Sequence, residues 1–144
     1  MAHLREASVT LPSDPASVGT ARRYVTGVLA GWGLSERSEE ADVVRLIVSE
    51  LATNAVQHTR GRSPVLTVEV RLERDAWLRI GVTDGHPRLP RRPSRPDRPD
   101  NGRGLLIVRT LTAAAGGRFC AAPAAGGGKT VWALLPWTSP AGGS

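Results

Sequence analysis

The strongest pattern in the chain is a helical repeat of apolar residues over residues 43–58. At about 100° per residue, five of these side chains fall into one stripe: Val44, Ile47, Val48, Leu51 and Ala55. The pattern predicts an amphipathic helix that packs this stripe against a core. Glu50 and Asn54 lie one turn apart on the margin of the stripe, so they are either a solvated rim pair or two members of a site.

Alternation of apolar and polar residues with a period of two predicts strands. The segments that show it are residues 5–11, 65–73, 76–84, 118–122 and 130–135. The two middle strands are joined by a tight turn, which indicates an antiparallel hairpin. Counting by two from Val82 reaches Asp84, so this carboxylate is expected on the buried side. The alternative for Asp84 is a cap on the following loop through Gly85.

Capping residues mark the predicted helices. Asp14 followed by proline starts a helix that ends near residue 30 or 32, with Gly33 as its C-cap. Ser35 or Ser38 caps the next helix, which continues to His58. A third helix is predicted over residues 105–115, and two glycines at its start would let a phosphate approach the backbone.

This order of elements predicts a two-layer α/β sandwich of the α+β class. Its sheet is expected to be mixed and mostly antiparallel, with the helices on one face. A chain of 144 residues suits one domain, expected over residues 1–136, with a flexible C-terminal tail over residues 137–144. Residues 85–102 are rich in proline and arginine and are interpreted as a lid loop of this domain.

Composition excludes several classes of protein. The N-terminus lacks a signal-peptide pattern and no segment is long and apolar enough to span a membrane, so we expect a cytoplasmic protein. The lone Cys120 is expected to be a small buried residue, and the histidines have no zinc-site spacing. Of the formal net charge of +6, residues 88–103 supply +4. A nucleic-acid partner is a minor alternative, because no aromatic residues interleave with that charge.

Two common nucleotide motifs are absent. Gly128-Lys129-Thr130 resembles the end of a Walker A loop, but Pro123 stands where the first glycine is required, and a strand follows. Gly102-Arg103-Gly104 resembles a dinucleotide fingerprint, but Ile107 stands at the third glycine. Four dispersed pieces remain: Glu50 with Asn54, Asp84 with Gly85, the segment 102–104, and the segment 128–130.

In their order and spacing these pieces resemble the N, G1, G2 and final Gly/Thr boxes of the Bergerat-fold (GHKL, histidine-kinase-like) ATPases. Within that family the chain is similar to the single-domain anti-sigma-factor serine/threonine kinases. The resemblance implies the Bergerat ATP-binding fold and ATP with Mg²⁺ as cofactors. It implies the following cofactor-binding residues: Asn54, Asp84, Gly85, Gly102, Arg103, Gly104, Leu105 and Thr130.

The resemblance also implies individual roles. Asn54 would hold Mg²⁺, and Glu50 would be the catalytic residue that orients the attacking hydroxyl or accepts its proton. Asp84 would accept the adenine amino group with help from the Thr130 hydroxyl, and the segment 102–104 would line the phosphates. His58 is interpreted as a packing residue.

The resemblance further implies an anti-sigma factor that binds a sigma factor and phosphorylates an anti-sigma antagonist on serine or threonine. Members of that family often form homodimers. The family commonly has D-x-G-x-G in its G1 box, whereas this chain has Asp84-Gly85-His86-Pro87. The alternative function is therefore an ATP-sensing binding module that regulates a partner without phosphotransfer.

Overall fold

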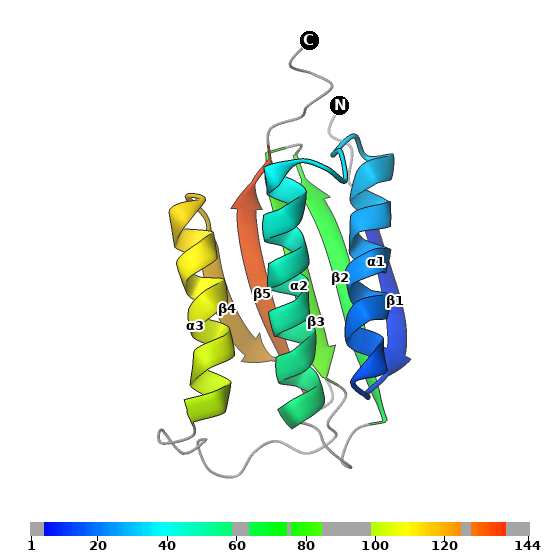
Figure 1. The fold of residues 1–144 in the computed structure, drawn as a ribbon, viewed down its shortest axis with the longest axis vertical. Coiled ribbons are helices and arrows are strands. Elements are labelled where there is room, and N and C mark those ends of the chain that lie inside the picture. Colours follow the sequence, from blue (N-terminus) through cyan, green and yellow to red (C-terminus); the bar gives the residue numbers. More distant parts are fainter. Residues whose placement is uncertain (1–4, 59–63, 75, 85–98, 125–127, 138–144) are drawn as a thin grey trace.

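The computed structural model describes residues 5–58, 64–74, 76–84, 99–124 and 128–137, with only the backbone for His58 and residues 99–104 (Figure 1). Five strands form one sheet in the order β1-β2-β3-β5-β4. They are β1 (Arg5–Pro12), β2 (Val65–Glu73), β3 (Trp77–Asp84), β4 (Arg118–Pro123) and β5 (Lys129–Pro136). Three helices cover one face of this sheet: α1 (Ala16–Gly31), α2 (Glu39–His58) and α3 (Pro99–Ala114).

This architecture confirms the predicted sandwich with helices on one face. The four strand pairings in the described sheet are all antiparallel, so the described strands contain no parallel pair. The β2–β3 hairpin turns at Arg74, whose φ of 55° is left-handed. The pairs β2–β3 and β4–β5 join strands that follow each other in the sequence. The pairs β1–β2 and β3–β5 join strands that are separated by at least one helix in the sequence.

Local capping signals set the C-terminal end of α1 and the start of α2 as predicted. The Gly33 N–H donates to the Ala30 carbonyl at 3.1 Å, and the Leu34 N–H donates to the Leu29 carbonyl at 2.9 Å. With Gly33 at φ 108°, this is a Schellman C-cap, which needs a residue tolerant of left-handed backbone. At the start of α2, the Ala41 N–H donates to the Ser38 hydroxyl at 3.1 Å, so Ser38 is the N-cap.

The core lies between the sheet and α2, which runs between α1 and α3 (Figure 1). The predicted stripe of α2 is buried in full: Val44, Ile47, Val48, Leu51 and Ala55. It meets the alternate side chains of β2 and β3 that face the helices, such as Val68 and Ile80, which are also buried. The apolar helix face and the apolar strand faces that the sequence predicts therefore pack against each other in one core.

Three expectations about boundaries and burial are wrong. Helix α3 begins at Pro99, six residues before the predicted start, because proline fits the first helical turn, where its missing N–H is not needed. Cys120 is exposed, because edge strand β4 points it away from the helices, beside Trp132. Trp137 is not part of a tail: its side chain is buried and its N–H donates to the Ala76 carbonyl at 2.8 Å.

The last residues of the predicted lid are helical. Residues 85–98 and 138–144 lie outside the described residues, and residues 99–102 belong to α3. None of the described helices combines the length and the apolarity that crossing a lipid bilayer requires.

Candidate functional site

One end of the molecule brings together the ends of four elements. The C-terminal end of α2, the end of β3, the start of β5 and the start of α3 all lie at the lower end in Figure 1. Asn54 and Asp84 come from the first two of these elements and are both buried polar residues. Buried polar side chains at one end of a sheet need partners, so this end is the candidate site.

Asn54 is the most unusual polar residue of this end. Its side chain is only 4% exposed, and its Oδ1 atom is buried without a hydrogen-bond partner among the described residues. A buried carbonyl oxygen without a partner costs free energy of folding, so it is retained where a ligand supplies the partner. An amide oxygen is a hard ligand of the kind that Mg²⁺ prefers, and Mg²⁺ often uses one or two protein ligands together with phosphates and water. The residue therefore fits the predicted metal.

Glu50 lies one helical turn before Asn54 and is half-buried. Its carboxylate thus stands at the same margin of α2, between the buried stripe and solvent. No group of three or more metal-binding acidic, histidine or cysteine side chains is found in the part of the chain that the structure describes. Asn54, with Glu50 beside it, remains the candidate through which this end would contact a metal–phosphate complex.

Asp84 ends β3 on the helix side of the sheet, as predicted, and is 5% exposed. Its Oδ1 atom accepts a hydrogen bond from the backbone N–H of Lys129 at 3.2 Å, across the β3–β5 pair. Gly128 makes this approach feasible, because a Cβ atom there would lie 2.1 Å from the Asp84 carbonyl oxygen and 3.3 Å from Oδ1. The Asp84 carboxylate is therefore held at a defined position at the end of the sheet.

Thr130 does not join Asp84. The register pairs Asp84 with Lys129 and Thr83 with Thr130, and residues directly opposite each other share one face of an antiparallel sheet. Thr130 consequently points to the face away from the helices, where its hydroxyl lies 2.7 Å from that of Thr83. The alternation in the sequence puts Lys129 on the same face as Val131, but only the register of β3 with β5 shows that Lys129 lies opposite Asp84.

Lys129 is the residue that sequence reasoning missed. It lies on the same face as Asp84 and is half-buried. Burial lowers the pKa of its ammonium group from the ordinary value of 10.5, and the nearby Asp84 carboxylate offsets part of this effect. The site therefore contains an acceptor and a cationic donor side by side.

The predicted phosphate-lining residues lie at the start of α3. Gly102, Arg103 and Gly104 are in the first two turns of this helix, and Leu105 packs against the core. The first turn of a helix carries backbone N–H groups without helical partners, which together with the helix dipole attract anions. Gly85 lies outside the described residues.

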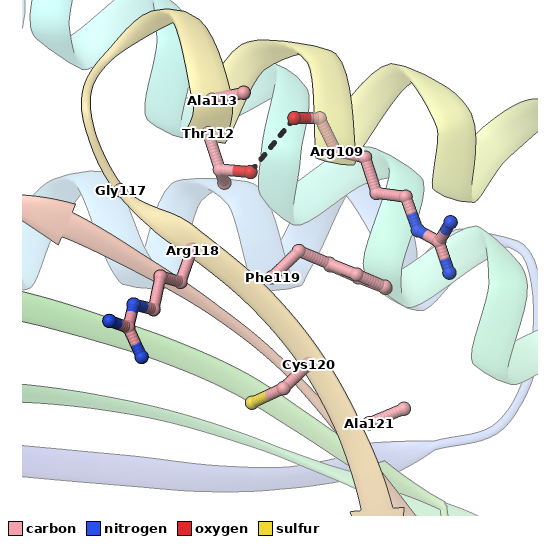
Figure 2. A pocket seen from close by; sticks show the side chains of 8 residues that line it. All are labelled: Arg109, Thr112, Ala113, Gly117, Arg118, Phe119, Cys120 and Ala121. Atoms are coloured by element: carbon pink, nitrogen blue, oxygen red, sulfur yellow. Dashed lines mark hydrogen bonds between the residues drawn. The ribbon is translucent and has the colours of Figure 1, made fainter.

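A separate hollow lies farther along the molecule, between the second half of α3 and β4 (Figure 2). Its lining includes Arg109, Thr112, Phe119 and Cys120, and none of the residues predicted to bind a cofactor. The Arg109 guanidinium stacks on the Phe119 ring at 5.3 Å from its centre, and the Thr112 hydroxyl donates to the Arg109 carbonyl. Neither of the described buried polar atoms that lack a hydrogen-bond partner belongs to this lining, so the hollow is not the candidate site.

The lowered pKa of Lys129 gives a testable pH dependence. Between its lowered pKa and 10.5, the unfolded chain binds more protons than the folded protein, so this group makes the free energy of unfolding rise with pH. We expect Lys129→Met to remove that contribution, as measured by urea unfolding of both proteins from pH 7 to pH 10.5. Contributions of groups that both proteins share cancel in the difference between the two stability curves. Parallel stability curves would contradict the assignment.

Comparison with known proteins places the fold. Residues 11–133 match the family of histidine kinase-like ATPase domains. The structure resembles that of the blue-light activated histidine kinase of Erythrobacter litoralis EL346, with 23% identity and a TM-score of 0.59, over 92% of this chain and 44% of the other. It also resembles full-length ShkA in complex with AMPPNP, with 21% identity and a TM-score of 0.58, over 90% of this chain and 31% of the other.

A third similar structure is the histidine kinase domain from the same Erythrobacter litoralis protein, with 24% identity, a TM-score of 0.54, and coverage of 88% and 61%. The chain thus spans less than two thirds of each of these solved chains, and at such identities the likeness concerns the fold. No curated protein matches the chain. Since the family match covers most of the sequence and the structure has the same fold, the chain belongs to the histidine kinase-like ATPase domain family.

Proposed function

We propose that this protein binds ATP with Mg²⁺ at the end of the molecule that holds Asn54 and Asp84. The observation that carries the proposal is the buried Oδ1 atom of Asn54, which has no partner among the described residues. A Mg²⁺ ion at this atom would supply the partner and would neutralise charge on the nucleotide phosphates. The complex of full-length ShkA with AMPPNP, an ATP analogue on a similar fold, supports a nucleotide as the ligand.

The other residues of this end would bind the rest of the nucleotide. Asp84 is an acceptor held in place by the Lys129 N–H, so its carboxylate suits the amino group of adenine. The start of α3, which includes Gly102, Arg103 and Gly104, would bind the phosphates through the free backbone N–H groups of its first turn and through the helix dipole. In this arrangement α2 would contact the metal, β3 would contact the adenine base, and α3 would contact the phosphates.

We further propose that the protein is an anti-sigma factor and a serine/threonine protein kinase. Its substrate would be an anti-sigma antagonist, and its second partner a sigma factor, with homodimerisation as in the similar kinases. Glu50 supports the kinase assignment, because a carboxylate one turn from Asn54 is close to the place where the γ-phosphate would lie. Glu50 would accept the proton of the substrate hydroxyl. The oxygen of that hydroxyl would bond to the γ-phosphorus as the bond to ADP breaks and ADP leaves.

A second candidate function is an ATP-sensing module that regulates its partner without phosphotransfer. The residues after Asp84 favour it, because His86 and Pro87 replace the glycine-rich pattern that the family commonly has in its G1 box. In this alternative Asn54 and Asp84 keep their roles, and Glu50 has no catalytic use.

The substitution Glu50→Ala separates the two candidates. If the protein is a kinase, transfer of phosphate from ATP to the antagonist should fall about 100-fold or more, because proton transfer to a placed base is lost, while ATP affinity is retained. Transfer is measured with labelled ATP and ATP affinity by calorimetry. The matched control is Glu40→Ala, which removes an exposed carboxylate from the first turn of the same helix.

Two results would contradict the kinase assignment. One is a wild-type protein that binds ATP but leaves its cognate antagonist without phosphate. The other is a Glu50→Ala protein that transfers phosphate at the rate of the Glu40→Ala control.

A further inference from the structure

We propose that Lys129 is a specificity-determining residue for the nucleotide base. Its ammonium group would donate a hydrogen bond to the ring acceptor of adenine, the N1 atom, which adjoins the amino group that Asp84 accepts. The inference rests on the proposed binding of ATP and adds a second base-reading residue to it.

The backbone holds Lys129 beside Asp84 by three features. The two residues are direct partners in the β3–β5 register, so their side chains leave the same face of the sheet. The Lys129 N–H donates to the Asp84 carboxylate at 3.2 Å, and Gly128 packs against the Asp84 backbone more closely than any other residue could. A ligand that contacts the Asp84 carboxylate therefore lies close to the Cα atom from which the Lys129 side chain leaves.

The residue that might have filled this role is turned away. Thr130 points to the opposite face and its hydroxyl is engaged with that of Thr83 at 2.7 Å. Lys129 is also the one lysine of the chain, whose formal positive charge otherwise comes from arginines. Lys129 is half-buried and occupies the position on β5 that is paired directly with Asp84.

The chemistry of the pair matches one edge of adenine. A carboxylate only accepts hydrogen bonds and an ammonium only donates them. Adenine presents on neighbouring atoms an amino donor and the N1 acceptor. Asp84 and Lys129 together would therefore satisfy both positions, with the Lys129 bond assisted by its positive charge.

A ligand lacking one acceptor tests this contact. 1-Deaza-ATP keeps the amino group and the triphosphate of ATP but has a C–H group in place of N1. We expect the wild-type protein to bind ATP about tenfold or more tightly than 1-deaza-ATP, since a hydrogen bond to a charged donor is lost. Lys129→Met should bind the two nucleotides with affinities equal within about twofold, and Lys129→Arg should retain a preference for ATP.

The quantity compared is the ratio of the affinities for ATP and 1-deaza-ATP. Both ligands carry the same triphosphate, so the loss of one positive charge weakens both equally and does not change the ratio. The control Arg118→Met removes another charge, from β4, and should leave the ratio unchanged.

The outcomes separate this inference from the proposed function. If the wild-type protein and Lys129→Met show the same ratio, Lys129 does not contact the base and the inference is wrong, although ATP binding stands. If the wild-type protein binds neither nucleotide, the proposed function is wrong and the inference falls with it.

Discussion

Replacing Asn54 with alanine should abolish the Mg²⁺-dependent part of ATP binding. In the wild-type protein, we expect ATP to bind much more tightly with Mg²⁺ than with a chelator, because the buried Oδ1 atom offers the metal an oxygen ligand. In Asn54→Ala, the affinity in Mg²⁺ should fall by about 100-fold, as removal of groups around a bound metal commonly costs 10- to 100-fold. Calorimetric titration with ATP, once in Mg²⁺ and once in chelator, measures the two affinities for each protein.

The same substitution should leave the unliganded fold intact. Asn54 Oδ1 has no hydrogen-bond partner among the described residues, so its removal breaks no hydrogen bond of that atom there. The control Thr53→Ala changes the preceding residue of α2, which is less buried, and should keep the Mg²⁺ effect. If wild-type affinity is equal in Mg²⁺ and in chelator, Asn54 is not a metal ligand.

Replacing Gly128 with alanine should destabilise the protein by about 3 kcal/mol and weaken ATP binding with it. The new Cβ atom would lie 2.1 Å from the Asp84 carbonyl oxygen, which is backbone and cannot rotate away. The start of β5 would have to move off the end of β3, which would break the hydrogen bond from the Lys129 N–H to Asp84. Urea unfolding gives the change in the free energy of unfolding.

The matched control for Gly128→Ala is Gly27→Ala in α1. A Cβ atom at residue 27 meets nothing within 4 Å, and alanine forms helices better than glycine. This substitution should therefore raise the free energy of unfolding by about 0.5–1 kcal/mol. A Gly128→Ala protein as stable as Gly27→Ala would show that β3 and β5 do not meet in the register described here.

Local patterns were sufficient for most secondary structure. The alternation over residues 65–73 predicts β2 without error, and Gly33 and Ser38 mark the helix ends that the structure shows. The sequence pattern starts α3 too late, because Pro99 is compatible both with a loop and with a first helical turn. The sequence also predicts a buried Cys120 because cysteine is commonly buried, whereas burial of an edge-strand residue depends on what covers that face.

By itself, the sequence determined the fold class, the inward direction of Asp84 and the neighbouring positions of Glu50 and Asn54 on one helix, because each follows from a repeat within a few residues. Only the tertiary structure decided that Lys129, and not Thr130, stands beside Asp84. It also left Asn54 Oδ1 buried with no partner among the described residues. The physical reason is that strand register and burial depend on segments far apart in the chain, and a shift of one residue exchanges the two faces of a strand.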